Sequence, residues 1–467
     1  MNDVRHDSRV RREATTLAAA GHRLTIVGSS GASTAAGSVE ADAIGEVRVL
    51  RVGERGQVPA PVVWADRPWT LRRRATGTVL AGVRDFPGAA PRAAVTALAA
   101  IASLPWIALR GAWLGARRAL GRPATQRPGW LTYLAAWLGP RRRWAQRATS
   151  VAPVSEIHHA HDLEALPAAI AAARRDGGRV VYDSHEIFTG WGPLLAQPRW
   201  LRSWFARRER RLVREVAAMV TVNDEIAAVL ERSLRPPRIT VVHNCPPRWT
   251  PPADDPGPLR SAAGIPAGCP IVLSHGNLQA NRGLERTAEA MTRPALASAH
   301  LVFLGYGRRV VDPLLADPRL AGRVHLLDPV PPDELLAWIA GADVDVMAIP
   351  AVDENSRLSS PNKLFESLAA GVPVVTSDLP VRRRVVLENG DGPLGAACDP
   401  DDPDSIAAAI ASIVLAPEDE RRALRARCLR AAHERWNWEI EGAKLVALYD
   451  DLATAPTGSS RRPGAGG

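Results

Sequence analysis

Lysine is almost absent from this chain of 467 residues: Lys363 and Lys444 are the only two lysines, against 57 arginines. The abundance of arginine, alanine, glycine and proline is typical of a GC-rich genome. Cysteine is scarce as well, and the four cysteines are scattered without a CxxC pair. This pattern argues against a disulfide framework or a zinc site and fits a reducing compartment.

Long hydrophobic runs are also rare. The stretch "MNDVRHDSRVRREATTL" lacks the apolar core of a signal peptide, so we expect a cytoplasmic protein. The uncharged run over residues 93–109 is short for a membrane span, is rich in alanine and contains Pro105. No transmembrane helix is therefore predicted.

Positive charge is concentrated in residues 66–150. This region contains 15 arginines and only two acids, Asp66 and Asp85, in a chain whose net charge is +10. Half of the 14 tryptophans lie between Trp64 and Trp144, and several are seven residues apart, which places them on one helical face. Arginine-flanked apolar helices of this kind favour peripheral binding to an anionic membrane surface. The alternative is a helical insertion that packs on the first domain.

The remaining chain contains two sets of alternating strand-like and helix-like segments. They predict an α/β protein with two Rossmann-like, doubly wound domains. The first domain, residues 1–250, has strands expected at 23–29, 47–52, 156–162, 179–185, 218–223 and 239–244, and Asp224 is expected to cap a helix. A proline-rich linker over 246–260 precedes the second domain, residues 251–435, with strands expected at 270–276, 300–307, 323–330, 344–350 and 372–377. A final helix (436–453) and a disordered tail (454–467) follow.

The stretch "SSPNKLFESLAAGVPVV" contains one of the two lysines. Ser360 and Pro361 predict the start of a short helix, and Gly371 predicts its end. Lys363 falls in the first helical turn, where the positive end of the helix dipole disfavours a cation unless an anion lies between them. A phosphate or diphosphate would supply that anion. Glu366, one turn later, could accept hydrogen bonds from ribose hydroxyls, and the simpler alternative is an exposed Lys–Glu pair.

This stretch resembles the nucleotide-sugar site of retaining glycosyltransferases of family 4, which have the GT-B fold of two Rossmann-like domains around a cleft. "DSRVRREATTLAAAGHRLTIVG", "HHAHDLEALPAA", "VVYDSHEIF", "VVHNCPP" and "GNLQANRGLERTAEAM" also match a branch of that family. The resemblance implies that the second domain binds the donor diphosphate and ribose, and that the terminal helix returns to the first domain. The donor-binding residues implied are Gly276, Arg282, Ser360, Asn362, Lys363 and Glu366.

The chain departs from the family pattern at two places. The usual signature is Glu-x7-Glu; its second Glu corresponds to Glu366, but its first position is Leu358, with Glu354 nearby. Many members also have a basic residue at the position of Asn277. In addition, the first strand of a doubly wound sheet is central, and its residues are not recognisable before "DSRV". We therefore hypothesise a translation start upstream of Met1.

Polar residues at strand ends complete the expected site. His161 corresponds to a family residue near the donor sugar and acceptor, and His185 and Glu186 follow the next strand; these three are the candidate catalytic residues. For His158 and His159 we expect structural roles. "DVD" (343–345) starts an apolar strand, so no metal site is expected there. "GYGRR" (305–309) lacks a full GxGxxG, which argues against a nicotinamide cofactor.

These observations predict a glycosyltransferase that moves a sugar from a nucleotide sugar to a hydroxyl acceptor with retention, without a metal or other cofactor and without nucleic acid. The basic region suggests a lipid-linked or membrane-proximal acceptor, as in polysaccharide or glycolipid assembly. Two alternatives stay open: a sugar-nucleotide epimerase with the same fold, and a degenerate, non-catalytic protein at a membrane surface, which Leu358 would favour.

Overall fold

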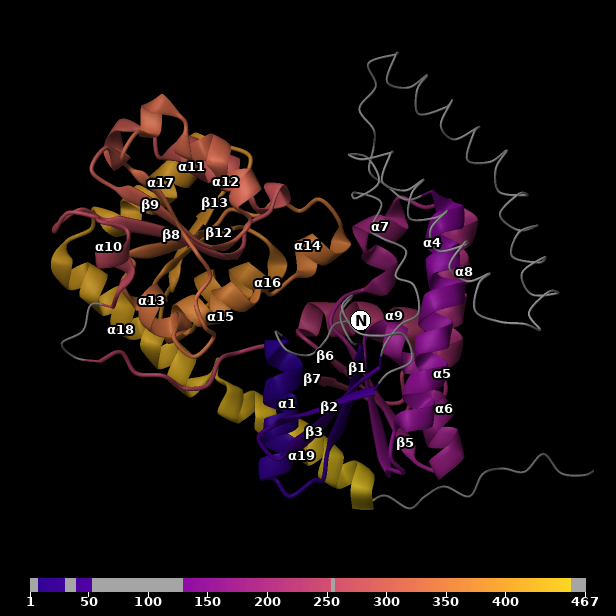
Figure 1. Cartoon of the computed structure of the whole chain (residues 1–467). Helices are drawn as coiled ribbons and strands as arrows, with labels where there is room; N and C mark the ends of the chain where they lie inside the picture. Colours follow the sequence, from indigo (N-terminus) through magenta and orange to yellow (C-terminus); the bar gives the residue numbers. More distant parts are fainter. Residues whose placement is uncertain (1–6, 30–38, 53–128, 253–256, 455–467) are drawn as a thin grey trace, which may run out of the picture. The chain divides into compact units, whose positions relative to one another are not determined.

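The structure is a computed structural model that describes residues 7–29, 39–52, 129–252 and 257–454. The predictions for most of the basic region, for the amino-terminal start and for the tail lie outside these residues. The chain divides into two compact units: one contains residues 1–31, 38–53 and 144–467, and the other contains 32–37 and 54–143. The first unit holds all the strands described below, and Figure 1 shows the course of its elements.

The strands of the first half form two sheets. Strands β4 (Ile157–His161), β5 (Arg179–Ser184), β6 (Ala218–Thr221) and β7 (Ile239–Val241) form a parallel sheet in that order. Strands β1 (Thr25–Ser29) and β3 (Val47–Val52) pair in parallel, and β2 (Val39–Ile44) pairs with β3 in the antiparallel direction. Strand β2 was not predicted. Its sequence, "VEADAI", carries two acids, and it joins β3 through a tight turn at Gly45, whose φ is 57°.

Helices cover the strands of the first half. They include α1 (Ser8–Ala19), α6 (Asp162–Asp176), α8 (Arg199–Val213) and α9 (Asp224–Leu234). The expected cap of α9 was wrong by one residue. Asn223 Oδ1, not Asp224, accepts the hydrogen bond from the Ile226 N–H, and Asp224 is the first helical residue.

The second half contains one parallel sheet of six strands in the order β10-β9-β8-β11-β12-β13. The strands are β8 (Ile271–Asn277), β9 (His300–Tyr306), β10 (Val324–Leu327), β11 (Val344–Met347), β12 (Val374–Ser377) and β13 (Gly395–Cys398). Five of them lie where the sequence placed them. The short strand β13 was missed because "GAAC" lacks the branched residues that mark a buried strand. This doubly wound sheet confirms the predicted fold class for this half.

Helices of the second half include α11 (Leu284–Ala290), α12 (Arg308–Leu315), α13 (Leu335–Ala340), α15 (Asn362–Ala369), α17 (Pro403–Val414) and α18 (Glu418–Glu434). The last helix, α19 (Trp438–Thr454), packs on the first half. Trp438 donates a hydrogen bond from Nε1 to Thr16 Oγ1 at 2.7 Å, and Leu445 and Leu448 share a buried cluster with Leu17 of α1.

Residues 129–151 are the part of the basic region that the structure describes, and they are helical. Helix α4 (Trp130–Ala136) leads into a π-helical turn, Trp137–Arg141, which contains Pro140, and then into α5 (Arg142–Val151). Proline cannot donate the backbone hydrogen bond of a regular α-helix, which accounts for the irregular turn. Within the described segments, no helix combines the length and apolarity required to cross a membrane.

Candidate functional site

Helix α15 begins beyond the carboxyl end of β11. Pro361 has extended backbone angles and stands at the cap position, so the helix starts at Asn362, one residue later than predicted. Ser360 does not cap the helix; its Oγ accepts a hydrogen bond from Asn223 Nδ2 of the first half at 3.2 Å. Gly371, with φ 71°, follows the helix end as expected.

Lys363 lies half-buried in the first turn of α15. Its Nζ donates a hydrogen bond to the carbonyl oxygen of Val346 in β11 at 3.2 Å. Burial lowers the pKa of Lys363, and Arg282 and Arg382 lower it further, although Asp345 opposes them. The simple Lys–Glu pair is not formed, because Glu366 contacts His275 instead.

Arg382 is a site residue that the sequence did not reveal. It ends the short helix α16 (Pro380–Arg382), and none of its surface is exposed (0%). Its Nη1 donates to the Ile349 carbonyl and its Nη2 to Ser359 Oγ, both at 3.1 Å. Burial, and then the nearby Arg282, lower its pKa to about 10. The run "VRRRVV" gave no signal that this arginine, rather than its neighbours, turns inward.

Arg282, Lys363 and Arg382 together form a cationic cluster at the start of α15. Within the described part of the chain, none of the three makes an ion pair, and the buried Nε atoms of Arg282 and Arg382 find no hydrogen-bond acceptor. Buried like charges without a counterion are costly. The cluster and the helix amino terminus are therefore complementary to a bound polyanion.

Glycines allow the backbone to approach closely around this cluster. Arg282 ends a single helical turn, Ala280–Arg282, and Gly283 follows it with φ 73°. A Cβ at Gly283 would lie 1.9 Å from the Ala348 carbonyl oxygen, so only glycine fits. Gly276, with φ 95°, is the first exposed residue of β8, and its carbonyl oxygen would lie 2.0 Å from a Cβ at Gly305.

Glu366 is held in position by a buried histidine. Its Oε2 lies 3.1 Å from His275 Nε2, and His275 Nδ1 lies 3.3 Å from Asp345 Oδ2. Ser367 Oγ also donates to Asp345 Oδ2, at 2.7 Å. Burial opposes protonation of His275, but the two carboxylates raise its pKa to about 9. A protonated His275 therefore orients Glu366, and neither His275 nor Asp345 was recognised from the sequence.

His161 and His185 meet at the carboxyl ends of β4 and β5 in the first half. His161 Nδ1 lies 3.3 Å from His185 Nε2, and both rings contact Asp183 Oδ2, at 3.3 and 3.1 Å. Burial opposes protonation of both imidazoles, but Asp183 raises the pKa of His161. Asp183 and Asp162 together raise the pKa of His185 to about 9. Asp162 is the first residue of α6 and has a strained φ of 62°.

Two residues of α1 complete this histidine cluster. Arg9 Nε lies 2.8 Å from Asp183 Oδ2 and 2.9 Å from Glu13 Oε1. Although burial opposes ionisation, Arg9 and His185 hold the pKa of Asp183 well below its usual value. Glu13, Asp183, His159 and His161 offer possible metal ligands within 4.8 Å of one another. Arg9 already pairs with both carboxylates, which makes this group an ion-pair network rather than a good cation site.

The remaining candidate residues, Glu186 and Asn362, each contact a residue of the other half. Asn355 of α14 (Glu354–Leu358) accepts from the Ile187 N–H at 2.8 Å and donates to the Ile187 carbonyl and to Glu186. Burial raises the pKa of Glu186. Asn362 Oδ1 accepts from Asn244 Nδ2 at 2.7 Å, which links α15 to the first half.

The structure shows the surroundings of Leu358, which replaces the first Glu of the family signature. Leu358 is buried (4% exposed), and its carbonyl accepts a hydrogen bond from Asn223 at 2.9 Å, whereas Glu354 is exposed one turn earlier. His158 Nε2 contacts Asp176 Oδ2 at 3.1 Å, consistent with its expected structural role. His159 bonds Tyr449 at 2.8 Å and stacks on His161, so it supports the histidine cluster.

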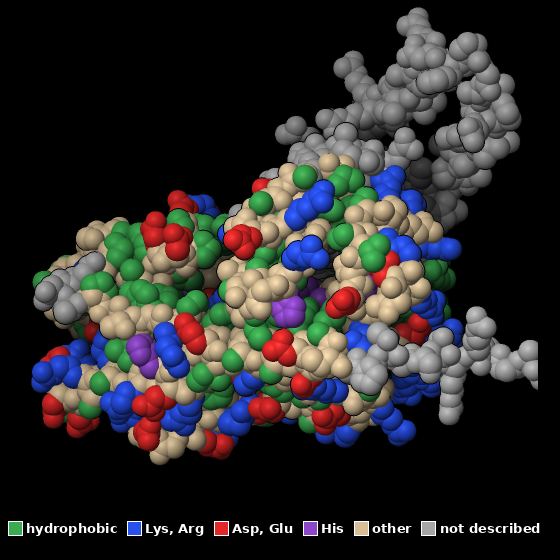
Figure 2. All heavy atoms as spheres, turned by 90° about the horizontal axis from the view of Figure 1, so that it is seen from below, with side chains coloured by type: hydrophobic (Ala, Val, Ile, Leu, Met, Phe, Trp, Pro, Cys, Tyr) green, Lys and Arg blue, Asp and Glu red, His purple; other side chains and the backbone are tan. Residues whose placement is uncertain are grey.

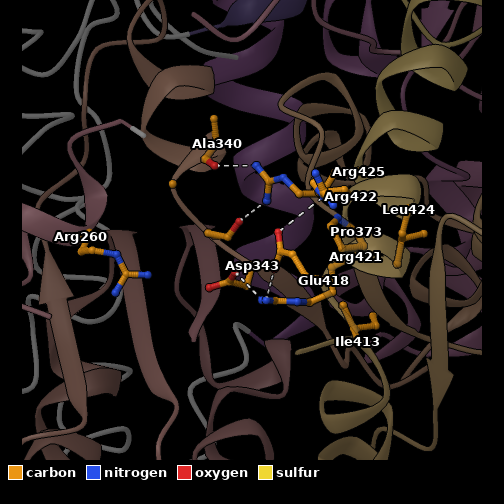
Figure 3. Close-up of a pocket in the computed structure, with 12 residues that line it drawn as sticks. Arg260, Ala340, Asp343, Pro373, Ile413, Glu418, Arg421, Arg422, Leu424 and Arg425 are labelled. Atoms are coloured by element: carbon orange, nitrogen blue, oxygen red, sulfur yellow. Dashed lines mark hydrogen bonds and ion pairs between the residues drawn. The ribbon is translucent and has the colours of Figure 1, made fainter. Parts of the chain in front are cut away.

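Asp343, the first residue of the "DVD" segment, lies away from both clusters. Asp343 accepts from the Ile271 N–H at 2.8 Å, at the amino end of the strands. Here a pocket of about 390 Å³ is lined by Asp343, Glu418, Arg260, Arg421, Arg422 and Arg425, and Figure 3 shows their arrangement. Arg425 donates to the carbonyls of Ala340 and Ala342, so this arginine is already engaged. None of the predicted site residues lines this pocket.

Comparison with solved structures identifies the fold. Sucrose-phosphate synthase from Thermosynechococcus elongatus superposes with a TM-score of 0.61 over 95% of this chain and 92% of its own, at 16% identity. HepE of Anabaena, solved with UDP and glucose, gives a TM-score of 0.52 over 68% of this chain and 83% of its own, at 16% identity. These similarities establish the fold, which is the GT-B fold predicted from the sequence.

The sequence matches are more specific. Residues 97–245 match the family described as "Glycosyltransferase Family 4", and residues 269–415 match "Glycosyl transferases group 1". D-inositol 3-phosphate glycosyltransferase from Xylanimonas cellulosilytica is 30% identical over 197 residues, which cover 41% of this chain and 44% of the relative. The match thus spans less than half the length of that relative. Two segments of this chain, one in each half, therefore match glycosyltransferase family models.

Proposed function

We propose that the protein transfers a sugar from a nucleotide-sugar donor to a hydroxyl acceptor, with retention at the anomeric carbon. The observation that carries this proposal is the cationic cluster of Arg282, Lys363 and Arg382 at the start of α15. Three cations without a carboxylate partner suit a diphosphate, whose negative charge grows as the sugar leaves. HepE, which shares the fold, binds UDP.

The residues around the cluster have separable roles in this proposal. Arg282, Lys363, Arg382 and the first N–H groups of α15 would bind the diphosphate. Glu366, oriented by protonated His275, would accept hydrogen bonds from the ribose. Gly276 would allow close approach of the donor, and Ser360 and Asn362 would fix the loop and helix start against the first half.

The first half would supply the acceptor side. His161, His185 and Glu186 lie at the carboxyl ends of β4 and β5 and would orient the donor sugar and acceptor. In the reaction, the bond between the anomeric carbon and the diphosphate oxygen breaks, and a bond to the acceptor oxygen forms on the same face. The acceptor proton passes to the departing diphosphate oxygen. No covalent enzyme intermediate is proposed.

We also propose that the reaction needs no metal ion. In many phosphate-transferring sites a divalent cation neutralises the diphosphate, whereas here three side-chain cations are available for that purpose. We expect turnover to persist in excess EDTA. Loss of turnover in EDTA, with recovery on adding Mg²⁺ or Mn²⁺, would contradict this.

We propose that the acceptor is lipid-linked or membrane-proximal, as in envelope polysaccharide or glycolipid assembly. We also propose that the protein is peripheral at the inner face of the cell membrane. The support is the arginine and tryptophan content of residues 66–150. A variant lacking residues 66–150 should bind anionic vesicles less than the full chain. Equal binding would remove this support.

Release of nucleoside diphosphate from a panel of UDP-, GDP- and TDP-sugars tests the central proposal. We expect release from one donor, increased by acceptor, with an α-linked product from an α-linked donor by NMR. A donor converted to its epimer without diphosphate release would indicate the epimerase. Donor binding without any conversion would indicate the non-catalytic alternative.

A further inference from the structure

Helix α8 has an outward face that is rich in arginine. Its buried side chains are Leu201, Phe205, Glu209 and Val213, which recur every four residues and form its inner stripe. Its exposed side chains, together with the residue that follows it, are Arg199, Trp200, Ser203, Arg207, Arg210, Arg211 and Arg214. Because successive residues of a helix turn by about 100°, these seven positions fall within about 120° of arc.

No acid lies on this outward face. The only acidic residue of α8, Glu209, points inward and accepts a hydrogen bond from Tyr182 at 3.0 Å, and burial raises its pKa to about 7. Glu215, just after the helix, is paired with Arg174 at 2.5 Å. The nearest acidic groups therefore do not neutralise the arginines of this face.

Most of these arginines have no ion pair. Among the residues that the structure describes, Arg199, Arg207, Arg211 and Arg214 have no carboxylate within ion-pair distance, and Arg210 contacts only the Ser233 carbonyl, at 2.9 Å. On the face shown in Figure 2, by contrast, basic and acidic side chains are interspersed. A cluster of one sign that the protein itself does not compensate calls for an anionic partner.

Tryptophan side chains beside these arginines indicate which kind of anionic partner binds. Trp200 is 51% exposed on the cationic face. Trp204, half-buried at its border, lies under the Arg208 guanidinium, whose carbon is 5.5 Å from the ring centroid. Arginine with tryptophan on an exposed helix is the composition that lies flat in the headgroup region of an anionic bilayer, where the cations meet lipid phosphates and the indole meets the acyl boundary.

We propose that the outward face of α8 docks the protein on an anionic membrane surface. The helix packs against α6 and α9, and the Phe205 ring lies 5.5 Å from Phe188, only two residues after Glu186. Docking through α8 thus positions the candidate acceptor residues close to the bilayer. The inference rests on the membrane-proximal location proposed above but assigns the contact to α8, and vesicle binding requires neither donor nor turnover, so its failure can be told apart from failure of the transfer reaction.

The test is co-sedimentation of the full chain with vesicles of phosphatidylcholine containing one-third phosphatidylglycerol. The variant R199Q/R207Q/R211Q removes three outward arginines that have no described partner. At roughly fivefold per arginine, it should lower the partition coefficient about 100-fold. The control R286Q/R422Q/R430Q removes the same charge from exposed positions of the second half and should change it less than threefold. Equal losses in both variants, or none in either, would overturn the proposal.

A second measurement reports the contact directly. A fluorophore sensitive to polarity, attached at Ser203→Cys, should shift to the blue on adding anionic vesicles, whereas one at exposed Ser261→Cys should not; wild type corrects for labelling of Cys269. If the triple variant loses affinity for a DNA oligonucleotide but keeps vesicle binding, the face binds nucleic acid and the proposal fails. Unchanged nucleotide release in the same variant would separate docking from the transfer reaction.

Discussion

Asp183 and Arg382 are both fully buried charges at the candidate site, yet their surroundings differ. Asp183, in the first half, contacts Arg9, His161 and His185, so its charge is compensated within the protein. Arg382, in the second half, donates only to two carbonyls and a hydroxyl among the described residues, and Arg282 and Lys363 add like charge around it. A compensated network positions side chains, whereas an uncompensated cluster is completed by an anionic ligand.

The largest expected effect comes from breaking the compensated network. Asp183→Asn leaves Arg9 and the two histidines without their shared carboxylate, so we expect a loss of about 3–5 kcal/mol in the free energy of unfolding. Urea unfolding followed by circular dichroism measures it. Asp451→Asn, which breaks the exposed pair with Arg238 at 2.8 Å, serves as a control and should cost far less. Equal losses would show that burial of the network is not decisive.

Removing one charge from the uncompensated cluster should instead affect function. Lys363→Ala removes the proposed diphosphate contact, so we expect kcat/KM for the donor to fall about 100-fold while the fold stays intact. Lys444→Ala is the matched control, because the only other lysine pairs with Glu441 at 2.8 Å on α19. Wild-type kinetics in Lys363→Ala would make the "SPNKLFE" stretch an ordinary helix start.

Alkaline pH should weaken both halves. The pKa values of His275 and His185 are raised to about 9 in the folded protein, against about 6.5 in an unfolded chain. Their stabilisation is therefore complete below about pH 6.5 and is lost as the pH rises through 9. We expect the free energy of unfolding to fall by about 1–3 kcal/mol between pH 6.5 and 9. The fall should be smaller in His275→Gln, and a stability that rises over this range would contradict the assignment.

The smallest effect is expected at Glu366. Glu366→Gln keeps the shape of the side chain but would weaken the proposed hydrogen bonds to ribose, and it removes the carboxylate that pairs with His275. We expect an increase of about tenfold in the donor KM with little change in kcat. Isothermal titration with the free nucleoside diphosphate and with inorganic diphosphate gives the control, since only the former contains the ribose.

The sequence predicted the elements whose signal is local. Hydrophobic runs located five strands of the second sheet, and Pro361 and Gly371 bounded helix α15 to within one residue. The helix start pointed to Lys363 and Glu366, and the resemblance to family 4 enzymes supported these residues and led to the GT-B fold. Strand β2 was missed because its residues are polar, and β13 because they are small.

Other site features depend on residues that are distant in the chain. His275, Asp345 and Glu366 come from two strands and a helix, and Arg9 reaches Asp183 across 174 residues. Nothing in "VRRRVV" distinguishes Arg382, because its burial depends on which face of α16 meets Ile349 and Ser359. Pairings of this kind arise only when the sheets bring their carboxyl ends together.

Composition and periodicity alone established the alternation of strands and helices, the helix start around Lys363 and the concentration of arginine. These depend on backbone preferences and on the period of side chains along one element. Only the tertiary structure decided which charges are compensated. Packing determines whether a buried cation meets a carboxylate. Arg9 does so, whereas Arg382 has only neutral partners among the residues that the structure describes.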